Sequence, residues 1–250
     1  MTADGRPDIQ GLWRGAGNAG GAAYDLERGM PDDERILTSR PAGRAPDVQV
    51  IVDPPDGKIP YLPWAAKLRD QLREKALHPT GREDLDSGTR CFQVGVPRHA
   101  FAGGGDFQVL QSPTYVVILY DRGSSRYIAL DGRAHISSKI KLWMGDSVGH
   151  WEGNTLVVDV ANNNEYPWYD VYGNFHSAEL RVVERWTILD ADTIRYEATN
   201  YDPKVFSRPW TLRNEFTRIR DKTYELWENT CYEGERSVDL ILSGSTAEKK

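Results

Sequence analysis

From Phe107 onward, apolar and polar residues alternate with a period of two, and no other feature constrains the fold as strongly. This alternation is typical of strands with one buried face. It predicts eight strands: Phe107–Gln111, Thr114–Tyr120, Arg126–Leu130, Thr155–Val160, Glu179–Ile188, Thr193–Tyr201, Thr211–Ile219 and Tyr224–Asn229. Several connectors are short and turn-like, so consecutive strands should be antiparallel neighbours.

A meander of this length predicts a mainly β fold that closes on itself. The expected architecture is an antiparallel up-and-down β-barrel of the lipocalin-like type, because closure removes exposed strand edges. A two-layer β-sandwich is the alternative. A barrel of this size can hold one small ligand.

The preceding half of the chain predicts one domain with an N-terminal extension. Residues 1–47 are rich in Gly, Pro, Asp and Arg and indicate an arm or long loop. Residues 48–250 should form a single β-barrel domain, in which Val48–Val52 is a short strand. Pro63–Leu77 is predicted to be one flanking helix. Its buried face would carry Trp64, Leu68, Leu72 and Ala76.

Charge and hydropathy exclude several functions. The net charge is −6 and the chain has no block of Lys and Arg, which argues against a nucleic-acid partner. No apolar run is long enough for a membrane span. The first residues lack the apolar stretch of a signal peptide, so the chain as it stands predicts a cytoplasmic protein. A periplasmic or secreted protein with its signal peptide removed would look the same, and a homo-oligomer stays open.

The strand faces place several polar side chains inside the barrel. Alternation puts Glu184, Asn214, Arg218 and Glu228 on otherwise apolar faces. A buried carboxylate must be paired, protonated or solvated. Either these residues form a structural ion pair between Arg218 and a glutamate, with Asn214 bonded to it, or they form the floor of a ligand cavity.

Histidines could supply proton transfer at the barrel rim. His135 and His176 lie in long connections, where loops place catalytic groups over a rigid scaffold. His78 and His99 lie in Pro-flanked loops and are expected to be solvated. His150 and Glu152 lie far from any compact metal motif, so no metal is predicted.

These residues suggest an enzyme that acts on a small molecule and needs no cofactor. It would use general acid–base catalysis of the lyase, isomerase or cyclase type. His135, His176 and Glu184 would be catalytic. An aromatic or apolar ligand would contact the candidate binding residues Trp143, Trp151, Trp186, Tyr196, Asn214, Arg218 and Glu228. One alternative is a binding or carrier protein without catalysis. The other is an extracellular glycan-binding module with Trp168, Tyr169 and Tyr172 as its platform.

The string GDSVGHWEGNTLVVDV resembles a family of uncharacterised bacterial proteins, many of them secreted. IALDGRAH before it, and HSAELRVVERW and YDPKVFSRPW after it, extend the resemblance, which runs from DIQGLW to ENTCYEGE. The family brings no assigned activity. From the residues alone, Cys91 and Cys231 would be reduced and buried. The secreted relatives instead favour a Cys91–Cys231 disulfide and an oxidising compartment.

Overall fold

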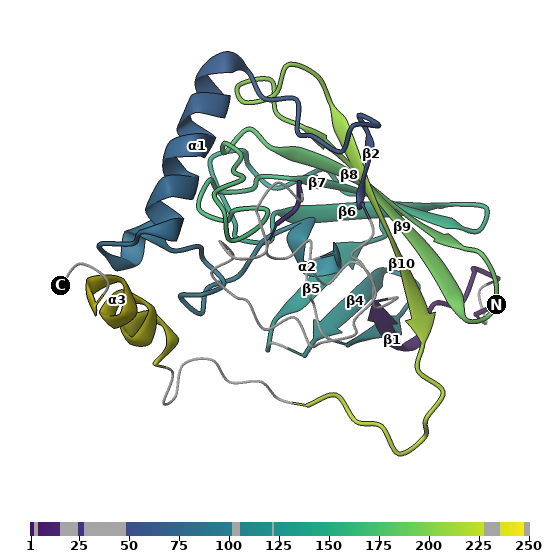
Figure 1. Cartoon of the computed structure of the whole chain (residues 1–250). Coiled ribbons are helices and arrows are strands. Elements are labelled where there is room, and N and C mark those ends of the chain that lie inside the picture. The colour runs from purple at the N-terminus through teal and green to yellow at the C-terminus, as the bar shows by residue number, and fades with distance from the viewer. Residues whose placement is uncertain are drawn as a thin grey trace.

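The computed structural model describes residues 1–2, 5–15, 25–27, 49–101, 106–121, 123–227 and 236–247. Within these residues, nine strands pair into a closed barrel, and a tenth, β2, is added at its edge (Figure 1). The strands are β1 Gly11–Gly15, β2 Ile51–Asp53, β3 Phe107–Gln111, β4 Tyr115–Tyr120, β5 Ser125–Ala129, β6 Asp146–Glu152, β7 Thr155–Ala161, β8 Arg181–Ile188, β9 Thr193–Tyr201 and β10 Trp210–Arg218. The predicted closed, mainly β barrel is confirmed, and the sandwich alternative does not apply.

The barrel closes where β1 pairs with both β3 and β10. All neighbouring strands are antiparallel except β5 and β6, which run parallel. The chain between them, residues 130–145, therefore crosses from one end of the barrel to the other instead of turning back. In this one pair the fold departs from a simple up-and-down meander.

Three segments differ from the predicted strands. Strand β6 was not predicted, because its inward positions hold Ser147 and Gly149 and do not read as an apolar face. Strand β1 comes from the segment assigned to an N-terminal arm. Residues 224–227 of the predicted last strand are not a strand, because β1 already occupies the free edge of β10. Residues 228–229 lie outside the described residues.

The predicted helix is α1, Pro63–Leu77, with the expected bounds. Its buried residues are Ala65 and Ala76, with Leu68 and Leu72 packed against the core. The prediction for Trp64 was wrong: the residue is 52% exposed, although its ring lies 6.2 Å from that of Phe175. Leu68, Leu72 and Ala76 face the core as predicted, and Ala65 takes the place expected for Trp64.

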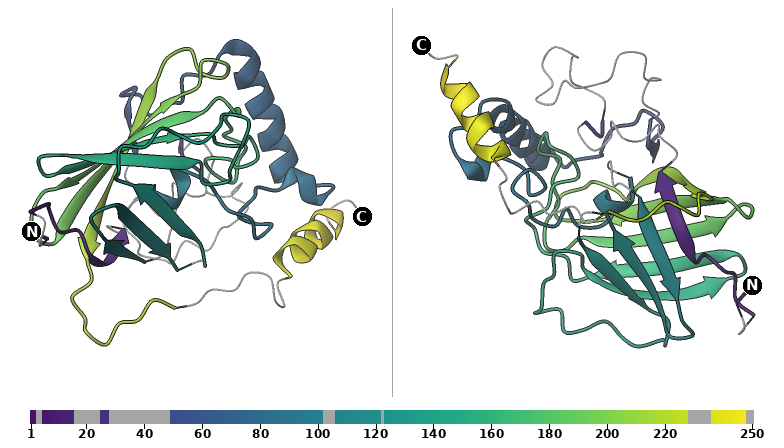
Figure 2. Two further views of the ribbon diagram at one scale, coloured as in Figure 1. Left: turned by 180° about the vertical axis from the view of Figure 1, so that it is seen from behind. Right: turned by 90° about the horizontal axis from the view of Figure 1, so that it is seen from below.

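Three further short elements complete the fold: the single-turn helix η3 Arg82–Asp84, and the helices α2 Arg98–Phe101 and α3 Ser237–Ala247. Helix α1 lies beside the barrel, and α3 lies next to the lower end of α1 (Figures 1 and 2). No helix in the described part of the chain is long and apolar enough to cross a membrane.

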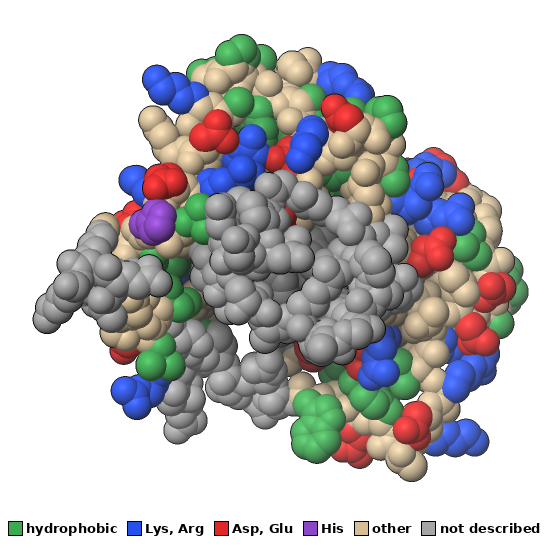
Figure 3. Space-filling view, in the orientation of Figure 1, with side chains coloured by type: hydrophobic (Ala, Val, Ile, Leu, Met, Phe, Trp, Pro, Cys, Tyr) green, Lys and Arg blue, Asp and Glu red, His purple; other side chains and the backbone are tan. Residues whose placement is uncertain are grey.

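The two ends of the barrel are built differently. One end, here the loop end, carries the long connections 162–180 and 202–209. The other, the turn end, has the short turns 153–154 and 189–192. The core lies inside the barrel and continues into the loop end, where the Tyr169 ring packs against Phe206 and Trp210. On the outer face, acidic and basic side chains are interspersed (Figure 3).

Candidate functional site

A buried ion pair between Arg126 of β5 and Glu184 of β8 lies inside the barrel. The Arg126 Nη1 donates to Glu184 Oε1 at 2.9 Å, and its Nη2 donates to Oε2. The two side chains are 2% and 0% exposed. This geometry is bidentate, the strongest arrangement for a guanidinium and a carboxylate. Although burial works against it, the charge of Glu184 raises the pKa of Arg126 above its ordinary value.

Two hydroxyl groups complete the surroundings of this pair. Tyr196 Oη donates to Glu184 Oε1 at 2.7 Å, and Arg126 Nε donates to Ser147 Oγ at 3.0 Å. Burial, followed by the charge of Glu184, raises the pKa of Tyr196 well above its ordinary value. The strand alternation explains the convergence, since all four residues occupy inward positions of β5, β6, β8 and β9. Both carboxylate oxygens of Glu184 therefore accept hydrogen bonds, and the carboxylate is the ion-pair partner of Arg126.

The wall next to the ion pair is aromatic. Phe107 of β3 meets Tyr120 at 6.1 Å and Trp186 at 6.2 Å between ring centroids. Trp186 also stacks on Phe216 at 5.4 Å and meets the Tyr196 ring edge-on at 4.7 Å. These five rings come from β3, β4, β8, β9 and β10, so they bridge the interior from one side of the barrel to the other.

Two polar groups in this wall have a donor hydrogen without an acceptor among the described residues. They are Tyr120 Oη and Trp186 Nε1. Burial, and to a lesser degree the charge of Glu184, raises the pKa of Tyr120 to about 12, although Arg126 acts in the opposite direction. Tyr120 is therefore a neutral phenol near pH 7, and its hydroxyl group can donate a hydrogen bond or a proton.

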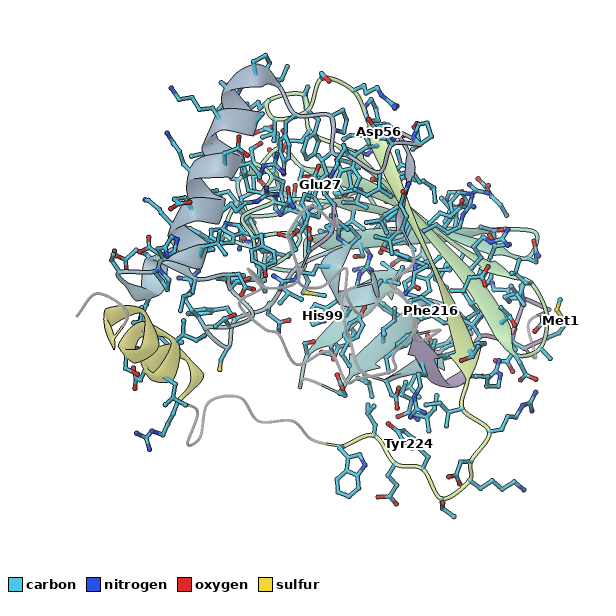
Figure 4. The ribbon with its side chains drawn as sticks, viewed as in Figure 1. Met1, Glu27, Asp56, His99, Phe216 and Tyr224 are labelled. Atoms are coloured by element: carbon cyan, nitrogen blue, oxygen red, sulfur yellow. The ribbon has the colours of Figure 1, made fainter. Side chains whose placement is uncertain are left out.

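His99 belongs to this region, contrary to the prediction that it is solvated. It lies on α2 and is 6% exposed, with its ring 4.6 Å from that of Tyr120. Its Nε2 is 3.3 Å from Gln93 Oε1. Helix α2 is held at the inner face of β10, where Asn214 Nδ2 donates to the carbonyl oxygen of Ala100 at 3.1 Å. Figure 4 shows His99 and Phe216 on the barrel side of the molecule.

His135 lies outside the barrel. Its Nδ1 is 2.7 Å from Asp146 Oδ2, and its Nε2 is 3.4 Å from Asp159 Oδ2. Asp159 points outward, because it alternates with the inward Val158 and Val160, and it pairs with Arg181 on the outer face. The crossing connection 130–145 places His135 there. His135 therefore does not share the interior with Glu184.

His176 is buried at the loop end. Its Nδ1 is 3.0 Å from the carbonyl oxygen of Ser177, and its ring meets Tyr169 edge-on at 5.3 Å. Burial lowers its pKa, so the ring is neutral near pH 7. The structure thus places the two predicted catalytic histidines in different surroundings, one on the outer wall and one in the aromatic packing of the loop end.

The predicted ligand-binding residues are also divided. Trp186, Tyr196 and Trp151 face inward, whereas Trp143 stacks on Phe92 at 5.2 Å outside the barrel. Arg218 does not pair with Glu184. Its guanidinium covers the Trp13 ring at 4.1 Å and bonds the carbonyl oxygen of Ala191, which closes the turn end. Arg126 takes the place predicted for Arg218, and Glu228 lies outside the described residues.

The predicted glycan platform is not a solvent-facing surface. Tyr169 and Tyr172 are 1% and 0% exposed, and Trp168 is half-buried. The Tyr169 hydroxyl group donates to Asn200 Oδ1 at 3.2 Å, and Tyr172 packs with Val171 and Leu77. The loop between β7 and β8 folds back onto the barrel, which buries these rings.

Cys91 is disulfide-bonded. Cys231, its predicted partner, lies outside the described residues. In the part of the chain that the structure describes, no group of three or more His, Cys, Asp and Glu side chains is placed to hold a metal ion.

No family model and no curated protein matches the chain. Among solved structures, a point mutant of the fluorescent protein UnaG is similar at 13% identity and a TM-score of 0.28, over 55% of this chain and 91% of that one. The barrel assignment rests on the strand pairing.

Proposed function

We propose that the protein binds a small molecule with an aromatic or apolar body inside its barrel, beside the Arg126–Glu184 ion pair. The observation that carries this proposal is a buried, fully paired charge cluster within an aromatic wall that still has unpartnered polar atoms, Tyr120 Oη and Trp186 Nε1. Ligand sites typically combine apolar lining with a few placed polar groups.

Energetics support a functional reason for the cluster. Taking two charges out of water costs several kcal/mol per ion, and apolar side chains of similar volume are often as stable. A barrel that needed only a core could hold Leu or Met at both positions. Retaining Arg126 and Glu184 provides a fixed dipole, with Tyr196 and Ser147 holding its orientation.

Titration with the neutral fluorescent probe N-phenylnaphthylamine tests the proposal. Its fluorescence rises in apolar surroundings, and one saturable site per chain is expected. Trp186→Phe should weaken binding, because the Trp186 ring lines the interior at 2% exposure. The matched control is Trp227→Phe, at a ring that is 77% exposed. An effect of Trp227→Phe without an effect of Trp186→Phe would place the probe on the surface and contradict the proposal.

A second candidate function is cofactor-independent acid–base catalysis of the lyase, isomerase or cyclase type. One observation favours it: a neutral, unpartnered phenol, Tyr120, lies against the buried imidazole of His99. In this proposal Tyr120 donates a proton to an oxygen of the bound molecule, while the imidazole of His99 accepts the proton that leaves the neighbouring carbon. The Arg126–Glu184 pair then stabilises the charge that develops. His135 is assigned no role here, because it lies on the outer wall.

Deuterium exchange tests the catalytic candidate. Acetonaphthone, an enolisable aromatic ketone, is incubated with the protein in deuterium oxide, and label at its methyl group is followed by mass spectrometry. The methyl protons should exchange faster in the presence of the wild-type protein than in buffer alone. Tyr120→Phe should lower the rate by about 10²–10⁴-fold, the usual effect of losing an acid–base group. Exchange at the buffer rate would leave binding as the function.

We infer an oxidising compartment from the disulfide at Cys91. Disulfides persist in the periplasm and outside the cell, and they are rare in the cytosol. Fractionation of the source cells, with thiol alkylation at lysis, tests this inference. A protein found in the cytosolic fraction with both cysteines alkylated would refute it.

A further inference from the structure

The unpartnered polar atoms that face into the barrel share one property. In the described part of the chain, the buried inward side-chain atoms without a partner are Tyr120 Oη, Trp151 Nε1, Trp186 Nε1 and Trp210 Nε1. An indole Nε1–H can only donate a hydrogen bond, and a neutral phenol donates readily. The barrel wall therefore offers donors that still need acceptors.

Two of these donors belong to side chains that contact the same ring. Tyr120 of β4 and Trp186 of β8 both contact the Phe107 ring, at 6.1 and 6.2 Å between centroids. Their side chains are 4% and 2% exposed. Leaving a buried donor without an acceptor costs about 1–3 kcal/mol. A ligand that supplies an acceptor to these groups recovers that cost.

The charges of the interior select a neutral acceptor. The positive charge of Arg126 is already cancelled by Glu184, and all three guanidinium nitrogens are engaged with Glu184 or Ser147. An anionic ligand would meet the Glu184 carboxylate without a free cation to pair with. A carbonyl oxygen accepts two hydrogen bonds and carries no net charge.

We propose that the ligand of this barrel is a neutral aromatic or conjugated carbonyl compound, whose carbonyl oxygen accepts hydrogen bonds from Tyr120 Oη and Trp186 Nε1. This inference rests on the proposed function, because it names the class of molecule that occupies the same interior. The ring system of the ligand would lie against Phe107 and Phe216, and its oxygen would point toward β4 and β8.

Three probes that share one ring system separate the classes. They are acetonaphthone, a neutral carbonyl compound; ethylnaphthalene, which has no acceptor; and naphthoate, a carboxylate. Affinities are measured by competition against N-phenylnaphthylamine. Acetonaphthone should bind about three- to tenfold more tightly than ethylnaphthalene, as expected for one or two neutral hydrogen bonds. Naphthoate should bind at least about tenfold more weakly than acetonaphthone, because its charge is desolvated without a partner.

Variants assign the preference to the named donors. Tyr120→Phe should remove most of the preference for the ketone over the hydrocarbon. Its thermal stability should stay close to that of the wild type, since the lost hydroxyl group has no hydrogen-bond acceptor among the described residues. The matched control is Tyr127→Phe on β5, where the side chain is 62% exposed. It should leave all three affinities unchanged.

The outcomes distinguish this inference from the proposed function. Equal affinity for acetonaphthone and ethylnaphthalene would overturn the carbonyl assignment and leave small-molecule binding intact. Tighter binding of naphthoate would also overturn it and would indicate an anion site. Binding of none of the three probes, together with no binding of N-phenylnaphthylamine, would overturn both proposals.

Discussion

Glu184→Gln is the substitution whose effect on stability follows most directly from the structure. The carboxylate accepts two bonds from Arg126 and one from Tyr196, and neither member of the ion pair is more than 2% exposed. The amide keeps one acceptor oxygen but turns an NH₂ group toward the guanidinium. Removing one partner of a buried ion pair costs about 3–5 kcal/mol, so the free energy of unfolding should fall by this amount.

The expected loss is large but leaves a folded protein. For a chain of this size, 1 kcal/mol corresponds to roughly 2–4 °C in Tm, so Tm should fall by roughly 6–20 °C. Urea unfolding followed by circular dichroism gives the free energy. The double variant Arg126→Met/Glu184→Gln should lose less than the sum of the two single variants, because each single variant leaves a buried polar partner unsatisfied. The coupling should reach about 1–3 kcal/mol.

An outer ion pair on the same sheet is the matched control. Arg213 and Glu197 join β10 to β9 with 46% and 28% exposed side chains. Glu197→Gln should cost less than about 1 kcal/mol, since exposed pairs contribute little. Strictly additive losses at Arg126 and Glu184, or equal losses at Glu184 and Glu197, would refute the argument that burial makes the inner pair interdependent.

Three further predictions concern other parts of the fold. The lowered pKa of His176 means that the unfolded chain binds a proton more readily than the folded chain does. Stability from this residue is therefore present above about pH 6.5 and is lost as the pH falls below it. His176→Gln should flatten the pH dependence of the unfolding free energy between about pH 7.5 and 5.5, and an unchanged slope would refute this prediction. Gly173→Ala should cost about 1–3 kcal/mol in the same urea assay, because φ is +81° and an added Cβ would lie 2.6 Å from Leu72 Cβ; Gly153→Ala, with φ +60° and nothing within 4 Å, should cost less. Peptide mapping without reductant should recover Cys91 linked to Cys231, whereas a linear Cys91 peptide would contradict the disulfide.

The fold could be predicted where alternation reflects a one-sided apolar surface. Strands β3, β4, β5, β7, β8, β9 and β10 were predicted within one or two residues of their ends, and so was α1. Strand β6 was not predicted, because small residues, Ser147 and Gly149, occupy its inward positions. The side chain of Arg126 lies next to Ser147 inside the barrel. Tyr224–Asn229 was predicted from alternation alone, but alternation does not show whether a sheet edge is free.

The candidate site could be predicted only in part. Burial of Glu184, Trp186 and Tyr196 follows from their strand faces. Arg126 was not predicted as the partner of Glu184. Contacts across a barrel depend on how far neighbouring strands are shifted along one another, and the alternation within a single strand does not show this shift. His99 was missed because Pro97 suggested a loop. The apolar residues Val96 and Ala100 around it were a signal that this part of the chain is buried.

The parallel pairing of β5 with β6 has a consequence for how the barrel assembles. Strands β6 to β10 form a meander of sequential hairpins, whose partners meet early because little chain separates them. Closure requires β1 to find β10 from the opposite end of the chain, and β5 to meet β6 over only two residue pairs. We expect the meander amides to gain protection from hydrogen exchange first during refolding. The bond from Arg126 to Ser147, which joins residues 21 positions apart, should then fasten β5 to β6, and the pairing of β1 with β10 should close the barrel last.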